Sequence, residues 1–161
     1  MLKPLEQFIC DRCGGVIEKT EDGWIEWIED PAPRSAHDFK IVHHKTKSPI
    51  KTKDGCYHHS DAHARCDEHL DKFLGKDIVF NLIFWIDNGP HIVSDYPGPI
   101  AKDLREWSEL AKRLLLPYYE EARFHLDAAI YDGVADDPGN PHALYSVTSL
   151  KRIAEKYSDY N

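Results

Sequence analysis

The chain of 161 residues lacks any apolar run long enough to form a membrane-spanning helix. Its first residues, Met1 to Glu6, also lack the apolar core of a secretory signal. Hydrophobic residues make up 42% of the chain and charged residues 30%, which is the composition of a protein that folds around a core. We therefore expect a soluble cytoplasmic protein that makes no contact with a membrane.

Positive charge is also scarce. The chain has 20 Lys and Arg against 28 Asp and Glu, for a formal net charge of -8. Phosphate contacts supply most of the non-specific affinity for nucleic acids, so this balance disfavours a nucleic-acid partner and favours a protein partner. The local exception is the stretch Lys40 to Lys53, which holds five lysines and no acid. We interpret it as a solvated loop and strand, with a phosphate-binding site as the alternative.

Sequence motifs of common enzymes are missing as well. The chain has neither the GxSxG motif of serine hydrolases nor a glycine-rich phosphate loop. Neither Cys56 nor Cys66 lies in a sequence setting that would activate a thiol nucleophile. We therefore favour a role without catalysis.

Cysteine is rare, but two of the four cysteines form the motif Cys10-Asp11-Arg12-Cys13-Gly14-Gly15. Two thiolates separated by two residues can bind the same tetrahedral zinc ion, and the glycines permit the tight turn that this requires. In a chain without a secretion signal, metal binding explains such a pair better than a disulfide does. We predict one structural zinc ion, and a cysteine pair without metal is the alternative.

The third predicted ligand is Cys56. It follows the turn signal Asp54-Gly55, as the first ligand of a second knuckle would. Cys66 could take its place, but it lies ten positions after Cys56, so the two cysteines do not form a knuckle together. We interpret Cys66 as a reduced and partly buried thiol.

The fourth ligand is left open between two histidines. His59 would complete a CxxH knuckle with Cys56, whereas His43 lies at the end of a predicted strand and could reach the same ion. His44 faces the other side of that strand and is the weaker choice. His59 and His63 are four residues apart, which leaves a second metal site as a further alternative.

The predicted fold class is α+β, with a metal-binding module at residues 1–75 and a helical region at 76–161. Strands are expected at Trp24 to Ile28 and Phe39 to His43, which are rich in aromatic and β-branched residues. The apolar run 78–86 is predicted to be a buried helix because capping residues flank it, although its composition also suits a strand.

Three further helices are predicted after the Pro/Gly break at 97–99. The spacing of apolar residues places them at about 100–115, 118–131 and 146–157. The loop between the last two is expected to include Asp136 to Pro141.

The N-terminal half resembles a zinc ribbon. The likeness rests on the CxxCGG knuckle at Cys10 to Gly15, the short antiparallel strands and the later Cys/His pair, over about residues 7 to 60. The chain as a whole is similar to small zinc-containing proteins of bacteria. The resemblance implies a single zinc ion that stabilises the fold and does no chemistry. The chain departs from a common zinc ribbon because it lacks a second CxxC.

Two other functions remain open. A CxxC followed by a strand that ends in His43-His44 resembles HNH nucleases, which implies His43 as general base and His44 or a neighbour as ligand of a divalent ion. Against this, no asparagine lies between His44 and Lys76, and no second CxxC follows. The other alternative is a DNA-binding regulator that reads DNA with its C-terminal helices, through Lys151, Arg152 and Lys156.

Overall fold

The computed structural model describes residues 1–58, 65–87, 99–135 and 139–158, and their contacts define two compact units. The sheet unit comprises Ile9–Ala111, and the helical unit combines Met1–Phe8 with Lys112–Asn161. Strands and helices both contribute, so the predicted α+β class is confirmed. The predicted division of the chain into a metal-binding module at 1–75 and a helical region at 76–161 stays a prediction.

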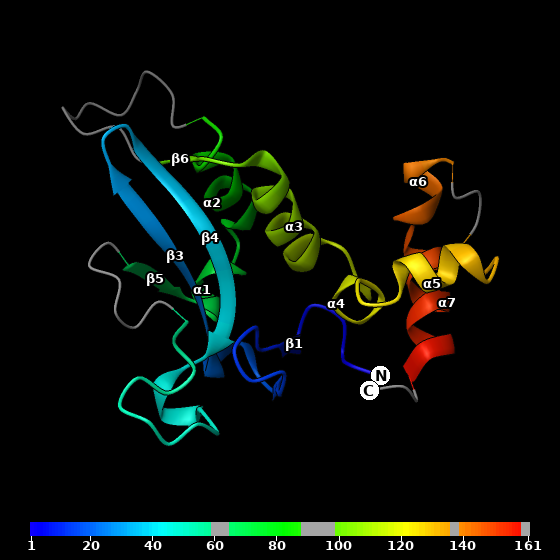
Figure 1. The fold of residues 1–161 in the computed structure, drawn as a ribbon, viewed down its shortest axis with the longest axis horizontal. Coiled ribbons are helices and arrows are strands. Elements are labelled where there is room, and N and C mark those ends of the chain that lie inside the picture. Colours follow the sequence, from blue (N-terminus) through cyan, green and yellow to red (C-terminus); the bar gives the residue numbers. More distant parts are fainter. Residues whose placement is uncertain (59–64, 88–98, 136–138, 159–161) are drawn as a thin grey trace. The chain divides into compact units, whose positions relative to one another are not determined.

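A four-stranded sheet with the order β5-β3-β4-β6 forms the sheet unit. Figure 1 shows the long hairpin of β3 (Gly23–Pro31) and β4 (Arg34–His43), in blue and cyan. β5 (Arg65–His69) pairs antiparallel with β3, and the short β6 (Ile100–Ala101) pairs parallel with β4. Both predicted strands lie within the hairpin.

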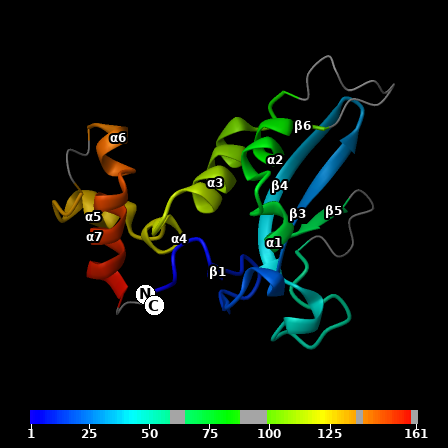
Figure 2. The ribbon, with the colours of Figure 1, turned by 180° about the vertical axis from the view of Figure 1, so that it is seen from behind.

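Shorter elements surround this sheet. β1 (Phe8–Ile9) and β2 (Val16–Ile17) form a two-stranded sheet, and two 3-10 turns lie at Thr20–Asp22 and Lys45–Lys47. Helices α1 (Leu70–Phe73) and α2 (Ile78–Phe84) pack beside the hairpin (Figure 2). Their side of the sheet is covered by an aromatic cluster, in which the Trp85 ring contacts the rings of Trp27, Phe39 and Phe73.

The apolar run at 78–86 is helical over α2, as predicted, but it is buried on one side only. Leu82 and Trp85 are buried, whereas Val79, Phe80 and Ile83 are exposed. The helix packs one face against the sheet, and a run that is apolar all round therefore leaves apolar side chains on its outer face.

The boundary between the two units falls within α3 (Leu104–Leu115). In the sheet unit, the Trp107 indole Nε1 donates a hydrogen bond to the carbonyl oxygen of Leu82, 3.1 Å away. This bond ties the first turns of α3 to α2.

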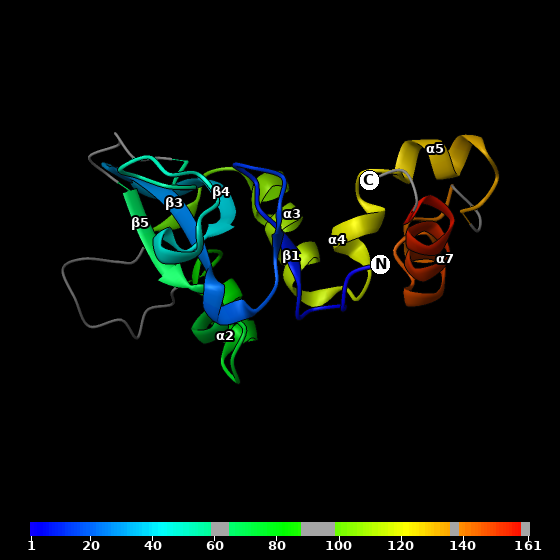
Figure 3. The same ribbon diagram turned by 90° about the horizontal axis from the view of Figure 1, so that it is seen from below.

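The helical unit contains α4 (Tyr119–Ala122), α5 (Leu126–Tyr131), α6 (Pro141–Leu144) and α7 (Val147–Tyr157), seen from another side in Figure 3. The helix predicted at 118–131 is therefore two helices, and the chain turns between them at Phe124 and His125. α6 begins at Pro141, the last residue of the stretch predicted as loop. The α7 prediction is confirmed, since Ser146 caps it by accepting a hydrogen bond from the Ser149 N–H.

A buried ion pair lies in the helical unit. Arg113 donates two hydrogen bonds to the Glu120 carboxylate, at 2.8 and 2.7 Å, and both side chains are less than one-tenth exposed. The bidentate geometry satisfies charges that would otherwise be costly to bury.

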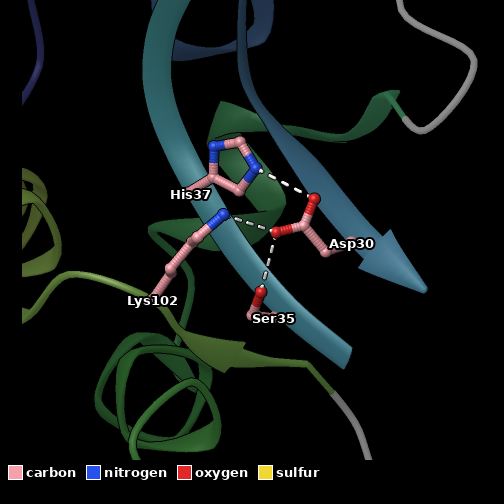
Figure 4. Close-up of polar contacts among 4 residues, drawn as sticks. All are labelled: Asp30, Ser35, His37 and Lys102. Atoms are coloured by element: carbon pink, nitrogen blue, oxygen red, sulfur yellow. Dashed lines mark hydrogen bonds and ion pairs between the residues drawn. The ribbon is translucent and has the colours of Figure 1, made fainter. Parts of the chain in front are cut away.

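Polar contacts hold the far end of the β3–β4 hairpin (Figure 4). The Asp30 carboxylate accepts hydrogen bonds from Lys102 Nζ at 2.8 Å and Ser35 Oγ at 3.1 Å, and the His37 ring lies 3.4 Å from it. The hydrogen bonds from Lys102 and Ser35 lower the pKa of Asp30 to about 2.

None of the helices in the described part of the chain combines the length and apolar character that a membrane crossing needs.

Candidate metal centre

The turn after β1 holds Cys10 and Cys13. The Cys10 N–H donates to the Gly15 carbonyl oxygen, and the Gly14 N–H donates to the Cys10 carbonyl oxygen, both at 2.9 Å. Gly14 has a φ of 71°, a left-handed conformation that glycine adopts without the strain a side chain would bring. The Gly15 N–H donates to Cys13 Sγ over 3.4 Å. The turn predicted from the CxxCGG motif is thus formed.

Asp11, inside the same turn, fastens it to β4. Its N–H donates to the Ile41 carbonyl oxygen at 2.8 Å, and its carboxylate accepts the Ile41 N–H at 2.7 Å. His43 follows Ile41 by two residues and so lies on the same side of the strand. The two bonds to Asp11 therefore bring the end of β4 next to the CxxC turn.

His43 points one ring nitrogen at the sulfurs and the other at the backbone. Its Nδ1 lies 3.5 Å from Cys13 Sγ and 3.8 Å from Cys56 Sγ, and its Nε2 lies 3.1 Å from the Val16 carbonyl oxygen. A carbonyl oxygen only accepts, so Nε2 carries the proton and Nδ1 keeps a lone pair that faces the thiols. Metal-binding histidines are held in this way, with the second nitrogen donating to a fixed acceptor.

Cys56 reaches the cluster from the polar loop that follows β4. Gly55 before it has a φ of 61°, and a side chain at this position would lie 3.0 Å from the Ser48 Cβ. Ser48 is buried, and its hydroxyl donates to Cys56 Sγ over 3.0 Å. The loop thus packs around the Cys56 sulfur.

The four side chains together form a compact donor set. Each of Cys10, Cys13, His43 and Cys56 offers one ligand atom, and these atoms all lie within 4.8 Å of one another. A tetrahedral site with zinc bond lengths would separate sulfur from nitrogen by about 3.6 Å and two sulfurs by about 3.8 Å. The distances from His43 Nδ1 to two of the sulfurs, 3.5 and 3.8 Å, agree with this geometry. We name these four residues the Cys3His cluster, and it could hold a metal ion.

Burial shapes the chemistry of the Cys3His cluster. Cys10 and Cys56 are fully buried or nearly so, and burial raises the pKa of the Cys10 thiol to about 12. A thiol of this kind becomes a ligand only by losing its proton to an incoming cation, so metal binding here releases protons. Soft thiolates and an imidazole select zinc or a similar metal over magnesium or calcium.

The other histidines considered as metal ligands are not part of the Cys3His cluster found among the described residues. His59 lies outside the described residues, as does His63, so the predictions about them stay predictions. His44 turns away from the cluster, with its Nδ1 2.7 Å from the Thr46 hydroxyl and its ring against Trp24. Burial and the nearby His69 lower its pKa.

Cys66 lies in β5, opposite Trp27, and is not part of the Cys3His cluster. All four cysteines of the chain are thiols. Burial and the neighbouring Glu29 raise the pKa of the Cys66 thiol to about 11, so it stays protonated at neutral pH. This environment agrees with the interpretation of a reduced, partly buried thiol.

Sequence reasoning missed the residues that support the ligands. The role of Asp11 could have been predicted in part, because a carboxylate inside the CxxC turn can accept hydrogen bonds from backbone N–H groups. No sequence pattern predicts the roles of the Ser48 hydroxyl and the Val16 carbonyl, since these roles depend on how the loop and β2 pack around the cluster.

The chain was compared with known proteins in three ways. No family model matches it, and the comparisons with curated proteins and with solved structures found no match either. The Cys3His cluster of the sheet unit, which could hold a metal ion, is therefore the feature of this chain that points to a function.

Proposed function

We propose that the Cys3His cluster binds one structural zinc ion and that the protein acts by binding a partner, without catalysis at the metal. The observation that carries this proposal is the number and kind of donors. Three sulfurs and one nitrogen make a complete tetrahedral shell, and a complete shell has no open position for water or substrate.

The proposed role of zinc is to join three segments that are far apart in the sequence. The CxxC turn supplies two ligands, the end of β4 supplies His43, and the polar loop supplies Cys56. In the described part of this loop the 3-10 turn Lys45–Lys47 is the one regular element, and a metal bond to Cys56 would therefore add order to the loop. Zinc binding at such a site contributes directly to folding free energy.

The nuclease alternative receives no support from this geometry. A general base needs a ring nitrogen that can take a proton from water. In His43, Nε2 faces the Val16 carbonyl and Nδ1 faces two sulfurs, so neither nitrogen is placed to act on a substrate.

The DNA-binding alternative is also without a supporting observation. Lys151 pairs with Glu155, Lys156 pairs with Asp132, and the Arg152 guanidinium donates to the Val134 carbonyl. These cations of α7 are engaged within the helical unit. Together with the net charge of -8, this favours a protein partner over nucleic acid.

The test of the proposal is metal content in matched variants. Protein purified without added metal should carry about one zinc per chain. Cys13→Ser should lower both the zinc content and the melting temperature, whereas Cys66→Ser should leave the zinc content unchanged. Full zinc content in a Cys10→Ser/Cys13→Ser double variant, or zinc loss in Cys66→Ser, would overturn the assignment.

A further inference from the structure

A second candidate site lies in the sheet unit, where a cavity of about 460 Å³ opens between the sheet and helices α1 and α2. Cavities of this volume accommodate small organic ligands. None of the residues of the Cys3His cluster lines it. The cavity is therefore independent of the proposed zinc site.

Aromatic rings form the wall and floor of the cavity. Phe73 and Trp85 make the floor and are buried, with their rings stacked 5.3 Å apart between centroids. Phe80 and Phe84 from α2 and Trp27 from β3 complete the wall, and Phe80 is 66% exposed. The centroids of the Phe80 and Phe84 rings lie 6.2 Å apart, and the exposure of Phe80 leaves ring surface open to a ligand.

Trp27 is held in place by a neighbouring carboxylate. Its indole Nε1 donates to Glu29 Oε1 at 3.1 Å, and Arg34 pairs with the other Glu29 oxygen at 2.9 Å. These bonds fix the ring plane of Trp27 at the cavity wall. A fixed ring costs little entropy when a ligand packs on it.

The polar groups of the lining are mainly acidic. Glu29, Glu68 and Asp77 supply three carboxylates, and Lys72 is the one cation among the described lining residues. Glu29 is paired with Arg34 at 2.9 Å and Glu68 with Lys72 at 3.7 Å, so within the described part of the chain the Asp77 charge is the one without an ion pair. The Asn81 side chain donates through Nδ2 to the Phe73 carbonyl at 3.3 Å, which leaves its oxygen as an acceptor. Hydrogen-bond acceptors and the Asp77 carboxylate thus lie beside an aromatic surface.

We propose that this cavity binds a small organic cation with an apolar body, of the arylalkylammonium class. The quadrupole of an aromatic ring attracts a cation over its face, and the Asp77 carboxylate adds to this attraction. The apolar body would bury itself against Phe80, Phe84 and Trp27. An anion of the same size would be repelled by the Asp77 carboxylate and by the negative faces of the rings.

The experiment uses the full chain with its metal and follows the indole N–H signal of Trp27 by NMR. Phenethylammonium is the probe, 2-phenylethanol is the neutral control of similar shape, and 3-phenylpropanoate is the anionic control. We expect saturable shifts with phenethylammonium at a Kd of about 0.1–1 mM. The neutral control should bind about tenfold more weakly, and the anion should produce no shift.

Variants locate the site. Phe80→Ala should weaken phenethylammonium binding about fivefold, and Glu68→Gln/Asp77→Asn should do so to a similar degree. Two controls make the same chemical changes in the helical unit: Phe124→Ala removes another exposed phenylalanine, and Asp127→Asn/Glu155→Gln removes two negative charges. Both controls should leave the Kd unchanged.

Three results would overturn the proposal. The first is no saturable shift of the Trp27 signal, and the second is equal affinity for the neutral alcohol, which would make the cavity merely apolar. The third is the same loss of affinity in the control variants as in the cavity variants. Since the exposed side chains of Phe80 and Asp77 can be changed without opening the core, these variants should fold, and circular dichroism checks that they do.

Discussion

Replacing His43 with alanine removes the single nitrogen donor of the Cys3His cluster, which is a ligand if the proposed zinc site is correct. Structural zinc sites bind the ion with about 10–16 kcal/mol of free energy. Shared among four ligands, this is about 2.5–4 kcal/mol for each, or about 70- to 900-fold in zinc affinity. Loss of the hydrogen bond from Nε2 to the Val16 carbonyl adds a smaller destabilisation of β2 against β4.

His44→Ala is the matched control for this substitution. It removes the neighbouring histidine, whose ring lies against Trp24 and whose Nδ1 contacts Thr46, outside the cluster. Zinc affinity is measured at fixed pH by competition with a chromophoric chelator. We expect the large loss for His43→Ala only. Equal affinities in the two variants would refute the ligand assignment.

A rescue variant separates lost coordination from lost folding. His43→Cys restores a fourth donor at the same position, so it should recover much of the zinc affinity that His43→Ala loses. A failure of both variants to bind zinc, while circular dichroism shows both to be folded, would mean that His43 matters through its hydrogen bond and not as a ligand.

Three further predictions concern other parts of the structure. Ser48→Ala removes the hydroxyl that donates to Cys56 Sγ, and we expect zinc affinity to fall about 10- to 100-fold, whereas Thr52→Ala in the same loop should change nothing. Arg113→Met leaves the Glu120 carboxylate buried without its main partner, so urea unfolding should show a loss of about 3 kcal/mol, compared with less than about 1 kcal/mol when Lys151→Met breaks an exposed pair. Because the folded state holds the pKa of Asp30 at about 2, below its ordinary value of 3.8, its stabilising contribution is complete above the ordinary value and disappears as the pH falls through about 2. A carboxyl NMR titration should therefore place the Asp30 pKa near 2, and Lys102→Met should raise it.

Several strands, turns and helix ends could be predicted from the sequence because they depend on residues close together in the chain. The run Trp24 to Ile28 has strand composition, and the Pro-rich break after it becomes the turn of the β3–β4 hairpin. Ser146 signals the start of α7 by its capping hydroxyl. These features depend on neighbours in the sequence, so the sequence predicts them well.

Features that depend on packing were harder to predict. Apolar residues lie on all sides of α2, so the sequence does not indicate which side packs against the sheet. The exposure of Phe80 could therefore not be predicted. The helix predicted at 118–131 is divided at Phe124 and His125, where no proline or glycine marks the break. Tertiary contacts decide such points more strongly than propensity does.

The candidate metal site shows the same contrast. Cys10 and Cys13 carry their own signal in the CxxC spacing, and Cys56 carries part of one in the turn before it. Spacing could not predict that His43 lies beside the sulfurs, because this depends on how β4 is fastened to the knuckle. The two hydrogen bonds between Asp11 and Ile41 bring His43 to the sulfurs, and such long-range pairing has no short-range signature.

The most direct test of the structural zinc assignment is X-ray absorption at the zinc edge, on protein purified with its native metal. A closed Cys3His site predicts three sulfur neighbours at about 2.3 Å and one nitrogen neighbour at about 2.0–2.1 Å, with no further ligand. A shell with oxygen in place of a sulfur, or with a fifth neighbour from water, would contradict such a site and reopen the question of metal-based catalysis.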